Sequence, residues 1–194
     1  MLGFYVVRVR GSAFVLFASG FAASAMEMVL LLAFQVICGS VYHQVGIIVT
    51  VFMAGLALGA LVTNRLASLG RGSLSWFALG IAGYAVLLPL LLPPLDRMGG
   101  SAASLVMVKA IVALLTLVLA VLVGMQFPLA NRLEFDGTAF GASRLYTADF
   151  VGAFLGALLT CTLLIPLIGV GGVCLLTAAL NVAGGWAGRR KSAT

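Results

Sequence analysis

The stretch that decides the fold runs from Gly11 to Cys38 and reads GSAFVLFASGFAASAMEMVLLLAFQVIC. Roughly 20 apolar residues in a helix cross a bilayer, so this stretch is long enough to span one. Its one charged residue is Glu27, and a carboxylate at the centre of a spanning helix costs on the order of 2.5–3.5 kcal/mol on insertion scales. Because a helix keeps such a group only where other helices or water compensate it, Glu27 is the first candidate functional residue.

The composition of the whole chain agrees with a membrane protein. Of its 194 residues, 63% are hydrophobic and 8% are charged, whereas a soluble domain has about 25% charged residues. The net charge is +6, and the basic residues lie at the ends of apolar segments, where they contact lipid headgroups. Since they form no patch interleaved with aromatic residues, we expect membrane lipids, and not nucleic acid, as their partners.

Hydropathy and turn residues divide the chain into six apolar segments. We predict an all-α fold, a polytopic membrane protein that forms a single domain over residues 1–194. The predicted transmembrane helices cover residues 11–38, 43–64, 74–93, 102–130, 144–168 and 170–187. The breaks between them carry glycine, proline or charge, as at Pro93-Pro94 and Gly169. The start of the chain resembles a signal peptide, but its apolar run continues to Cys38, so we expect an uncleaved first helix.

The basic residues set the expected orientation. With the N-terminus inside, the inner side of the membrane holds Arg8, Arg10, Arg65, Arg71, Arg132, Arg144, Arg189, Arg190 and Lys191. The outer side holds only Arg97, while Lys109 lies within a segment. Such an asymmetry is the positive-inside pattern. It predicts that both termini face the cytoplasm and that the chain lies in the inner (cytoplasmic) membrane of a bacterium.

A sequence pattern that occurs twice divides the chain into halves. Gly55 to Thr63 reads GLALGALVT, and Gly152 to Thr160 reads GAFLGALLT, 97 positions later. Two consecutive sets of three helices must be inverted relative to each other, and inverted three-helix repeats build transporter halves. The alternative is that small-xxx-small spacing recurs by chance, because it lets membrane helices approach. In either case we expect helix packing at Gly55, Gly59, Gly152 and Gly156.

Three charged residues lie inside predicted helices: Glu27, Lys109 and Asp149. Each shares a face with small or polar residues at helical spacing: Gly20, Ser24, Glu27 and Leu31; Lys109, Ala113, Thr116, Ala120 and Gly124; Asp149, Gly152, Gly156 and Thr160. Such faces turn toward the interior of a bundle. Depth along the helices predicts a pair of Glu27 with Lys109. It also predicts that Asp149 pairs with Arg65 or Arg144 near the inner boundary.

These charges have more than one interpretation. The ion pairs could serve only to fix the register and packing of the helices. Alternatively, Glu27, alone or with Lys109, lines a site for a cation, another polar ligand or a proton. An interface with another subunit is the third alternative. The other binding candidates are Asp149, Tyr146 and Arg65.

The sequence offers no site for a metal or a cofactor. His43 is the single histidine, so haem ligation by two histidines is not expected. The cysteines, Cys38, Cys161 and Cys174, have no CxxC spacing, and neither a zinc site nor a disulfide framework is expected. GxSxG, GxGxxG, phosphate-loop and HExxH motifs are absent. We therefore predict that the chain is not an enzyme.

Several stretches together resemble one family. They are SGFAASAME from Ser19, FMAGLALG from Phe52, GMQFPLA from Gly124, LYTAD from Leu145 with the glycines that follow it, and LIPLIG from Leu164. In combination they resemble the six-helix membrane segment of the membrane-bound spermidine-synthase-like proteins, over nearly the whole chain. Met26 stands where that family usually has Tyr. The family's cytosolic aminopropyltransferase-like domain has no counterpart in this sequence.

A weaker similarity links the same six helices to one half of a major-facilitator transporter. It is carried by Gly59 to Gly72, with Asn64, Arg65 and Arg71. Two functions follow as expectations. The first is a non-enzymatic membrane subunit that anchors or docks a partner protein. The second is a small carrier for a polyamine-like or other cation, working as a homodimer.

Overall fold

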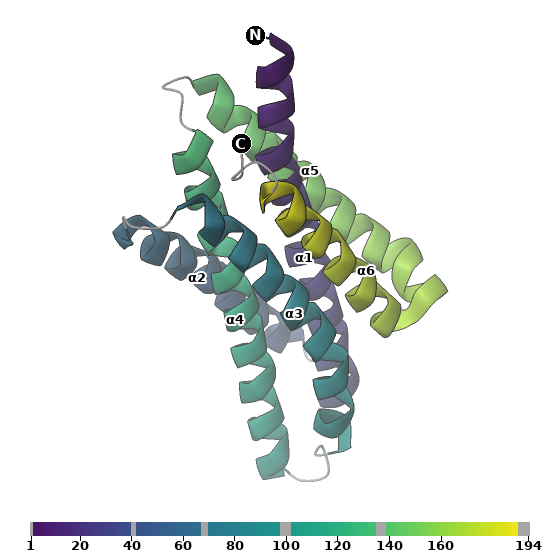
Figure 1. Ribbon diagram of the computed structural model, residues 1–194. Helices are drawn as coiled ribbons and strands as arrows, with labels where there is room; N and C mark the ends of the chain where they lie inside the picture. The colour runs from purple at the N-terminus through teal and green to yellow at the C-terminus, as the bar shows by residue number, and fades with distance from the viewer. Residues whose placement is uncertain (1, 40–41, 67–69, 98–101, 135–138, 190–194) are drawn as a thin grey trace.

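The computed structural model describes residues 2–39, 42–66, 70–97, 102–134 and 139–189 (Figure 1). Every element in these ranges is helical. In order, they are α1 (Leu2–Cys38), α2 (Tyr42–Arg65), α3 (Arg71–Arg97), α4 (Ala102–Glu134), α5 (Ala139–Leu159), a π-helical turn η1 (Thr160–Leu164) and α6 (Ile165–Arg189). Much of the predicted charge asymmetry falls outside the described side chains: Arg8, Arg10, Arg71, Arg97, Arg189, Arg190 and Lys191.

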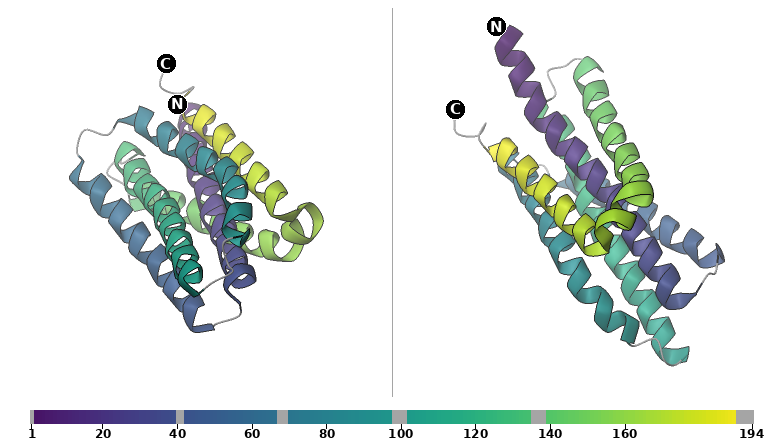
Figure 2. Two further views of the ribbon diagram at one scale, coloured as in Figure 1. Left: turned by 90° about the horizontal axis from the view of Figure 1, so that it is seen from below. Right: turned by 90° about the vertical axis from the view of Figure 1, so that its right-hand side faces the viewer.

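Five stretches of the described residues are long and apolar enough to cross a membrane. They are Ser12–Cys38, Val45–Arg65, Gly72–Leu95, Leu105–Leu133 and Gly141–Ala187, and the last covers α5, η1 and α6. The prediction of an all-α membrane protein is confirmed at this level. The first turns of α1 and the last turns of α6 lie toward the same end of the bundle (Figures 1 and 2).

The helices are longer than the apolar segments predicted. α3 continues through Pro93 and Pro94 to Arg97, since a membrane helix tolerates proline where neighbouring groups satisfy the freed carbonyls. α4 continues to Glu134 and α5 begins at Ala139, so the predicted break between them is much shorter than expected. Polar residues near the helix ends interrupt the apolar run but are still helical. Hydropathy alone therefore makes these helices too short.

The chain reverses direction at Gly169, inside α6, because the backbone stays helical from α5 through η1 into the first turn of α6 (Figure 2). The wide turn η1 ends just before Pro166, which has no amide hydrogen and disturbs a regular ladder. Gly169 then adopts φ 68° and ψ 176° inside α6, a region open essentially to glycine alone. The boundary predicted at Gly169 coincides with this break.

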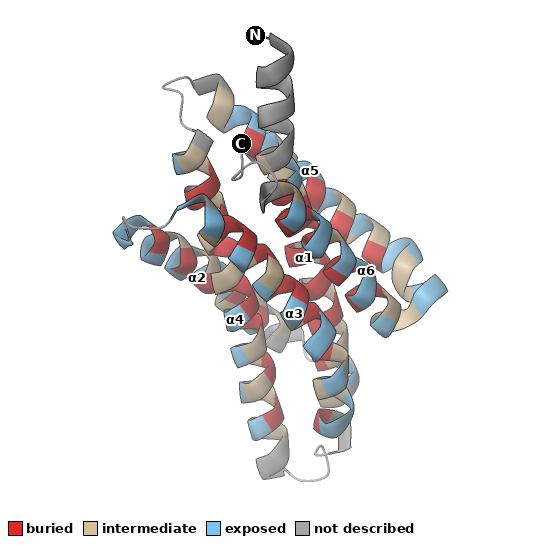
Figure 3. Cartoon of the chain, viewed as in Figure 1, coloured by how far each residue is buried: buried red, intermediate tan, exposed pale blue. Residues whose placement is uncertain are grey.

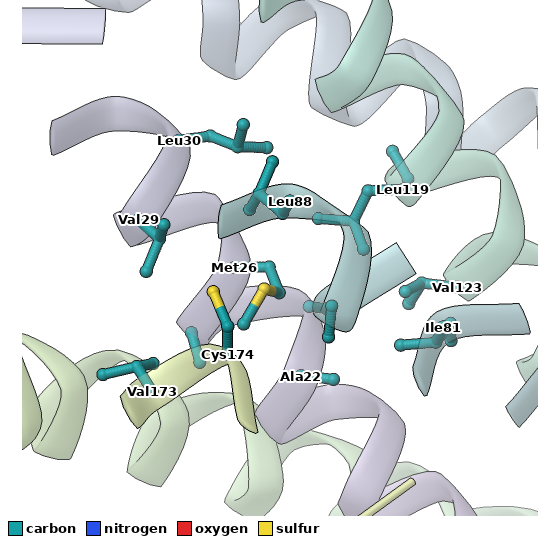
Figure 4. Packing of buried hydrophobic residues seen from close by; sticks show 14 of the residues in the cluster. Ala22, Met26, Val29, Leu30, Ile81, Leu88, Leu119, Val123, Val173 and Cys174 are labelled. Atoms are coloured by element: carbon teal, nitrogen blue, oxygen red, sulfur yellow. The ribbon is translucent and has the colours of Figure 1, made fainter. Parts of the chain in front are cut away.

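α1 lies at the centre of the bundle and contacts α3, α4, α5 and α6. Buried residues face inward and exposed apolar residues face outward (Figure 3), as in a protein surrounded by lipid. In the core, Met26 of α1 and Cys174 of α6 point toward one another, near Leu88 of α3 (Figure 4). This core joins the central helix to helices from both ends of the sequence.

Glycine lets two pairs of helices pack backbone to backbone. In the pair of α1 with α5, a Cβ added to Gly156 would lie 2.9 Å from the Cα of Phe21. In the pair of α2 with α4, a Cβ on Gly59 would lie 3.0 Å from the backbone of Gly124. Both distances are too short for a real side chain. Small residues at such contacts are the usual means by which membrane helices associate.

Candidate functional site

A partly open pocket of about 210 Å³ lies among four helices. It is lined by Ser19 of α1, Leu56 and Ala60 of α2, Val123, Gly124, Phe127 and Pro128 of α4, and Asp149 of α5. Of the described residues that line the pocket, Asp149 alone is ionisable. The pocket is smaller than the roughly 300–1,000 Å³ of sites for drug-sized ligands, so its volume suits a small ligand.

Asp149 is held in the pocket by the close packing of α5 on α1. A Cβ added to Gly20 of α1 would lie 2.7 Å from Asp149 Oδ1, so only glycine leaves room for the carboxylate here. Gly152 and Gly156 continue the same contact one and two turns along α5. In the part of the chain that the structure describes, no side chain donates a hydrogen bond to Asp149 and no cation pairs with it. The carboxylate is therefore free to bind a ligand.

One aromatic ring, that of Phe127, lines the pocket, and it is in contact with a second ring outside it. The ring of Phe127, which lines it, meets Tyr146 edge to face with centroids 6.1 Å apart. Tyr146 in turn lies 4.2 Å from Phe150, the residue that follows Asp149. Both Tyr146 and Phe150 are exposed on the outer face of α5. A carboxylate beside an aromatic face is a combination that attracts cations.

The expected pair of Glu27 and Lys109 is not formed among the described residues. Glu27 is half-buried, lies outside the pocket, and makes no hydrogen bond or ion pair there. Lys109 instead lies within electrostatic range of Cys38 at the end of α1, and 11 residues separate Cys38 from Glu27, about 16 Å along a helix. The predicted helix ends at Cys38 and Ala102 agree with the structure, but Lys109, seven residues into α4, lies near Cys38, so the two ends from which depth was counted are not level.

The structure also separates Glu27 from Asp149. The residue of α1 that touches Asp149 is Gly20, and Glu27 lies seven positions further along, about 10 Å at the helical rise. The predicted partners of Asp149 are elsewhere too, since no ion pair with Arg65 or Arg144 is formed within the described ranges. The side chain of Arg65 is exposed at the end of α2. The candidates thus do not form one cluster.

Arg132 has a structural role that the sequence did not reveal. Its guanidinium donates hydrogen bonds to the carbonyl oxygens of Thr63 (3.1 Å), Asn64 (2.8 Å) and Leu66 (3.3 Å). These are carbonyls at the end of α2, which the helix itself leaves unsatisfied, and the positive charge complements the helix dipole. Thr63 adds a bond to the carbonyl of Met125 at 3.2 Å. α4 thereby fixes the end of α2.

Four buried polar side chains have an atom without a hydrogen-bond partner among the described residues; Thr160 was predicted to share a face with Asp149, whereas the other three were not singled out from the sequence. Gln126 of α4 is 0% exposed, and neither its amide nitrogen nor its amide oxygen has a hydrogen-bond partner in the described part of the chain. The same holds for Ser75 Oγ of α3 and Asn181 Oδ1 of α6. A glutamine and an asparagine inside apolar segments are signals that the sequence does contain.

The described residues contain no group of three or more His, Cys, Asp or Glu side chains that could hold a metal ion. Comparisons with protein-family models, with curated proteins and with solved structures find no match to this chain. The function therefore has to be argued from the pocket and from the packing around it.

Proposed function

We propose that the protein is a membrane carrier that binds a small cation at Asp149. The observation that supports this is a pocket in which, among the described residues, the one ionisable group is a carboxylate and no other side chain pairs with it. A charged group in a membrane segment is costly and is usually kept for an ion or substrate path. A cation bound in the pocket would neutralise Asp149, while Phe127 would contact its apolar part. The proposal assigns no enzymatic activity to the chain.

The resemblance to the spermidine-synthase-like membrane segment favours a polyamine-like cation. We propose that the 47 residues of Gly141–Ala187 cross the membrane twice, because they would extend about 70 Å as one helix whereas the apolar core of a bilayer is about 30 Å. The chain would then have six crossings, with both termini in the cytoplasm of a bacterial cell.

The proposed fold also has inverted three-helix repeats. In its support, Gly55 and Gly59 of α2 pack on Leu117 and Val121 of α4, while the corresponding glycines of α5 pack on Phe17 and Phe21 of α1. If α1 corresponds to α4 and α2 corresponds to α5, then the contact of α2 with α4 corresponds to the contact of α5 with α1. Six-helix units of this kind rock against a second bundle, so the carrier would work as a homodimer.

Thermal unfolding in detergent tests the binding site with spermidine as the probe. A ligand at 100 times its Kd stabilises the folded state by about 2.7 kcal/mol, so spermidine should raise the Tm of the natural chain. Asp149→Asn should abolish this rise. Glu27→Gln, which changes the carboxylate outside the pocket, should retain it. If spermidine raised the Tm of Asp149→Asn as much as that of the natural chain, the proposal would be contradicted. If only Glu27→Gln lost the rise in Tm, the site would be at Glu27 instead.

A second candidate function is a non-enzymatic subunit that docks a partner protein. Its support is the helical segment formed by η1 and the first turn of α6, which projects from the bundle (Figure 3) and exposes Cys161, Leu163 and Leu167. A photoreactive crosslinker attached to Cys161 in native membranes would capture one defined protein, whereas Cys174 is buried and should not be modified. Capture of lipid alone would contradict the docking role.

A further inference from the structure

The four helices that line the Asp149 pocket are packed together on three sides and not on the fourth. α2 packs on α4, with Gly59 against Gly124, and α5 packs on α1, with Gly20 and Gly152 in the contact. α1 packs on α4 as well, whereas no extended contact joins α2 to α5 in the described part of the chain. The pocket is therefore a groove whose floor is α1 and α4 and whose walls are α2 and α5.

The floor of this groove is closed by apolar packing on both sides of the pocket. Ser19, which lines the pocket, lies in α1 between Leu16 and Ala22. Leu16 belongs to a buried cluster with Leu129 of α4, and Ala22 belongs to another with Val123 of α4. A ligand therefore has no open way to Asp149 through the interior of the bundle. The opening that remains is the one between α2 and α5.

This opening faces the lipid. Figure 2 shows α3 and α6 on one side of the bundle and α2 and α5 on the other. Met53 shares a face of α2 with the lining residue Ala60 at helical spacing and is exposed. On α5, the exposed rings of Tyr146 and Phe150 flank Asp149 in the sequence and contact one another. The opening is therefore framed by side chains that suit an acyl chain better than water.

The Phe127–Tyr146 contact bridges the groove toward one end of the bundle. Tyr146 precedes Asp149 by one turn of α5, and its ring meets that of Phe127 on α4 with centroids 6.1 Å apart. Arg144 lies further toward the same end of α5. Since these rings lie between Asp149 and that end, the sideways route between α2 and α5 is favoured over a route along the helix axes.

The pocket also lies at a defined depth. Three lining helices carry an arginine five residues from a lining residue, toward one end of the bundle: Ala60 and Arg65, Phe127 and Arg132, Asp149 and Arg144. Five residues of helix rise about 7.5 Å, and arginines near the ends of membrane helices lie at the level of the lipid headgroups. The carboxylate is thus just below that level, within reach of the polar head of an amphiphile whose chain stays in lipid.

The charge of the pocket restricts what can bind there. Among the described lining residues Asp149 alone is ionisable, and the hydroxyl of Ser19 already donates to the carbonyl of Leu16 at 3.0 Å. One carboxylate neutralises one ammonium group. A phosphate would find no cation in the lining, and the further ammonium groups of a polyamine would lie uncompensated beside apolar side chains, which is costly in a membrane.

We propose that the Asp149 pocket binds the ammonium head of a single-chain amphiphilic amine, which enters sideways from the bilayer between α2 and α5. The ammonium group binds the carboxylate, Phe127 contacts the first carbons, and the rest of the chain lies in lipid beside Met53 and Phe150. This inference rests on the proposed cation site and narrows its ligand class. Spermidine would place one ammonium group at the same carboxylate and would be the weaker ligand.

Photocrosslinking in phosphatidylcholine vesicles tests the sideways site. The probe is hexadecylamine with a diazirine close to its amino group, and the control probe is the corresponding alcohol. Crosslinked peptides are identified by mass spectrometry. We expect the amine to label the peptides that contain Met53 or Phe150 at least about tenfold more in the natural chain than in Asp149→Asn, because a hydrogen bond between charged groups is lost. The alcohol should label both chains equally.

A second pair of variants leaves Asp149 unchanged and decides the matter if Asp149→Asn does not fold. Ala60→Leu fills the pocket from α2, whereas Ala54→Leu adds the same side chain at an exposed position of that helix outside the pocket. We expect the amine to lose its labelling in Ala60→Leu and to keep it in Ala54→Leu. Circular dichroism checks that both variants are folded.

Equal labelling by the amine in the natural chain and in folded Asp149→Asn, or in Ala60→Leu and Ala54→Leu, would overturn the inference. If spermidine raises the Tm through Asp149 while amine labelling is independent of Asp149, the cation site stands and the sideways amphiphile fails. If neither responds to Asp149→Asn, the cation site itself fails. Loss of labelling on addition of phosphatidylethanolamine would overturn the single-chain ligand in favour of a lipid headgroup.

Discussion

Adding one methyl group at Gly156 should separate the two helices that hold Asp149 in place. In Gly156→Ala the new Cβ would lie 2.9 Å from Phe21 Cα and 3.0 Å from its carbonyl carbon, whereas nonbonded carbon atoms prefer about 3.5–4.0 Å. α1 and α5 must therefore move apart by about 0.6 Å or more at this turn. Overpacking of this kind costs about 1–3 kcal/mol, which corresponds to a roughly 5- to 150-fold change in the unfolding equilibrium.

Gly83→Ala is the matched control for this prediction. Gly83 lies on the exposed face of α3 with no atom within 4 Å of an added Cβ, and alanine is the better helix former by about 1 kcal/mol. Both variants would be unfolded in detergent and followed by circular dichroism. We expect Gly156→Ala to unfold at a lower temperature than the natural chain, and Gly83→Ala at the same or a higher one. Equal stability of the two variants would refute the close packing of α1 on α5.

Two further substitutions test the other structural features. Arg132→Ala removes the three hydrogen bonds to the end of α2 and should cost about 1 kcal/mol, discounted for exposure. Arg65→Ala at the exposed end of the same helix should leave the thermal unfolding midpoint unchanged, and equal losses would contradict the specific role of Arg132. Gly169→Ala should cost about 1–3 kcal/mol through backbone strain alone, because no atom lies within 4 Å of its added Cβ. Gly171 is equally open but has no positive φ, so Gly171→Ala should not lower the stability. Similar thermal unfolding midpoints for the two variants would argue against the break at Gly169.

The fold could be predicted to the level of helices because lipid imposes simple rules on sequence. Length and hydropathy alone placed the apolar stretches, and the glycine run at 169 to 172 marked the reversal after α5. Helix ends were less predictable, since residues such as Asn131 and Arg132 continue α4 beyond the apolar run. The guanidinium of Arg132 binds carbonyl oxygens at the end of α2. No local sequence pattern predicts a contact between residues so distant in sequence.

The candidate site was predicted in part. Asp149 could be singled out because a carboxylate in an apolar helix is costly wherever it lies. Its surroundings could not, because they depend on which turn of α1 meets α5, and Gly20 rather than Glu27 is at that turn. Counting residues from a predicted helix end gives depth but not the direction in which a side chain points. The sequence therefore could not show whether the side chains of Glu27 and Lys109 point toward one another.

Close backbone contacts and buried polar side chains occur together in this small bundle. Glycine contacts fix α1 to α5 and α2 to α4, where a single methyl group would force the backbones apart. A bundle that was only an anchor would have no need for buried amides without partners, because an apolar side chain of similar size would pack there at lower cost. Gln126 of α4 and Asn181 of α6 are nevertheless fully buried, and each has an amide atom without a hydrogen-bond partner among the described residues. A buried amide atom without a partner costs roughly 1–3 kcal/mol, so keeping two such residues favours a bundle that binds a polar ligand over one that only anchors a partner.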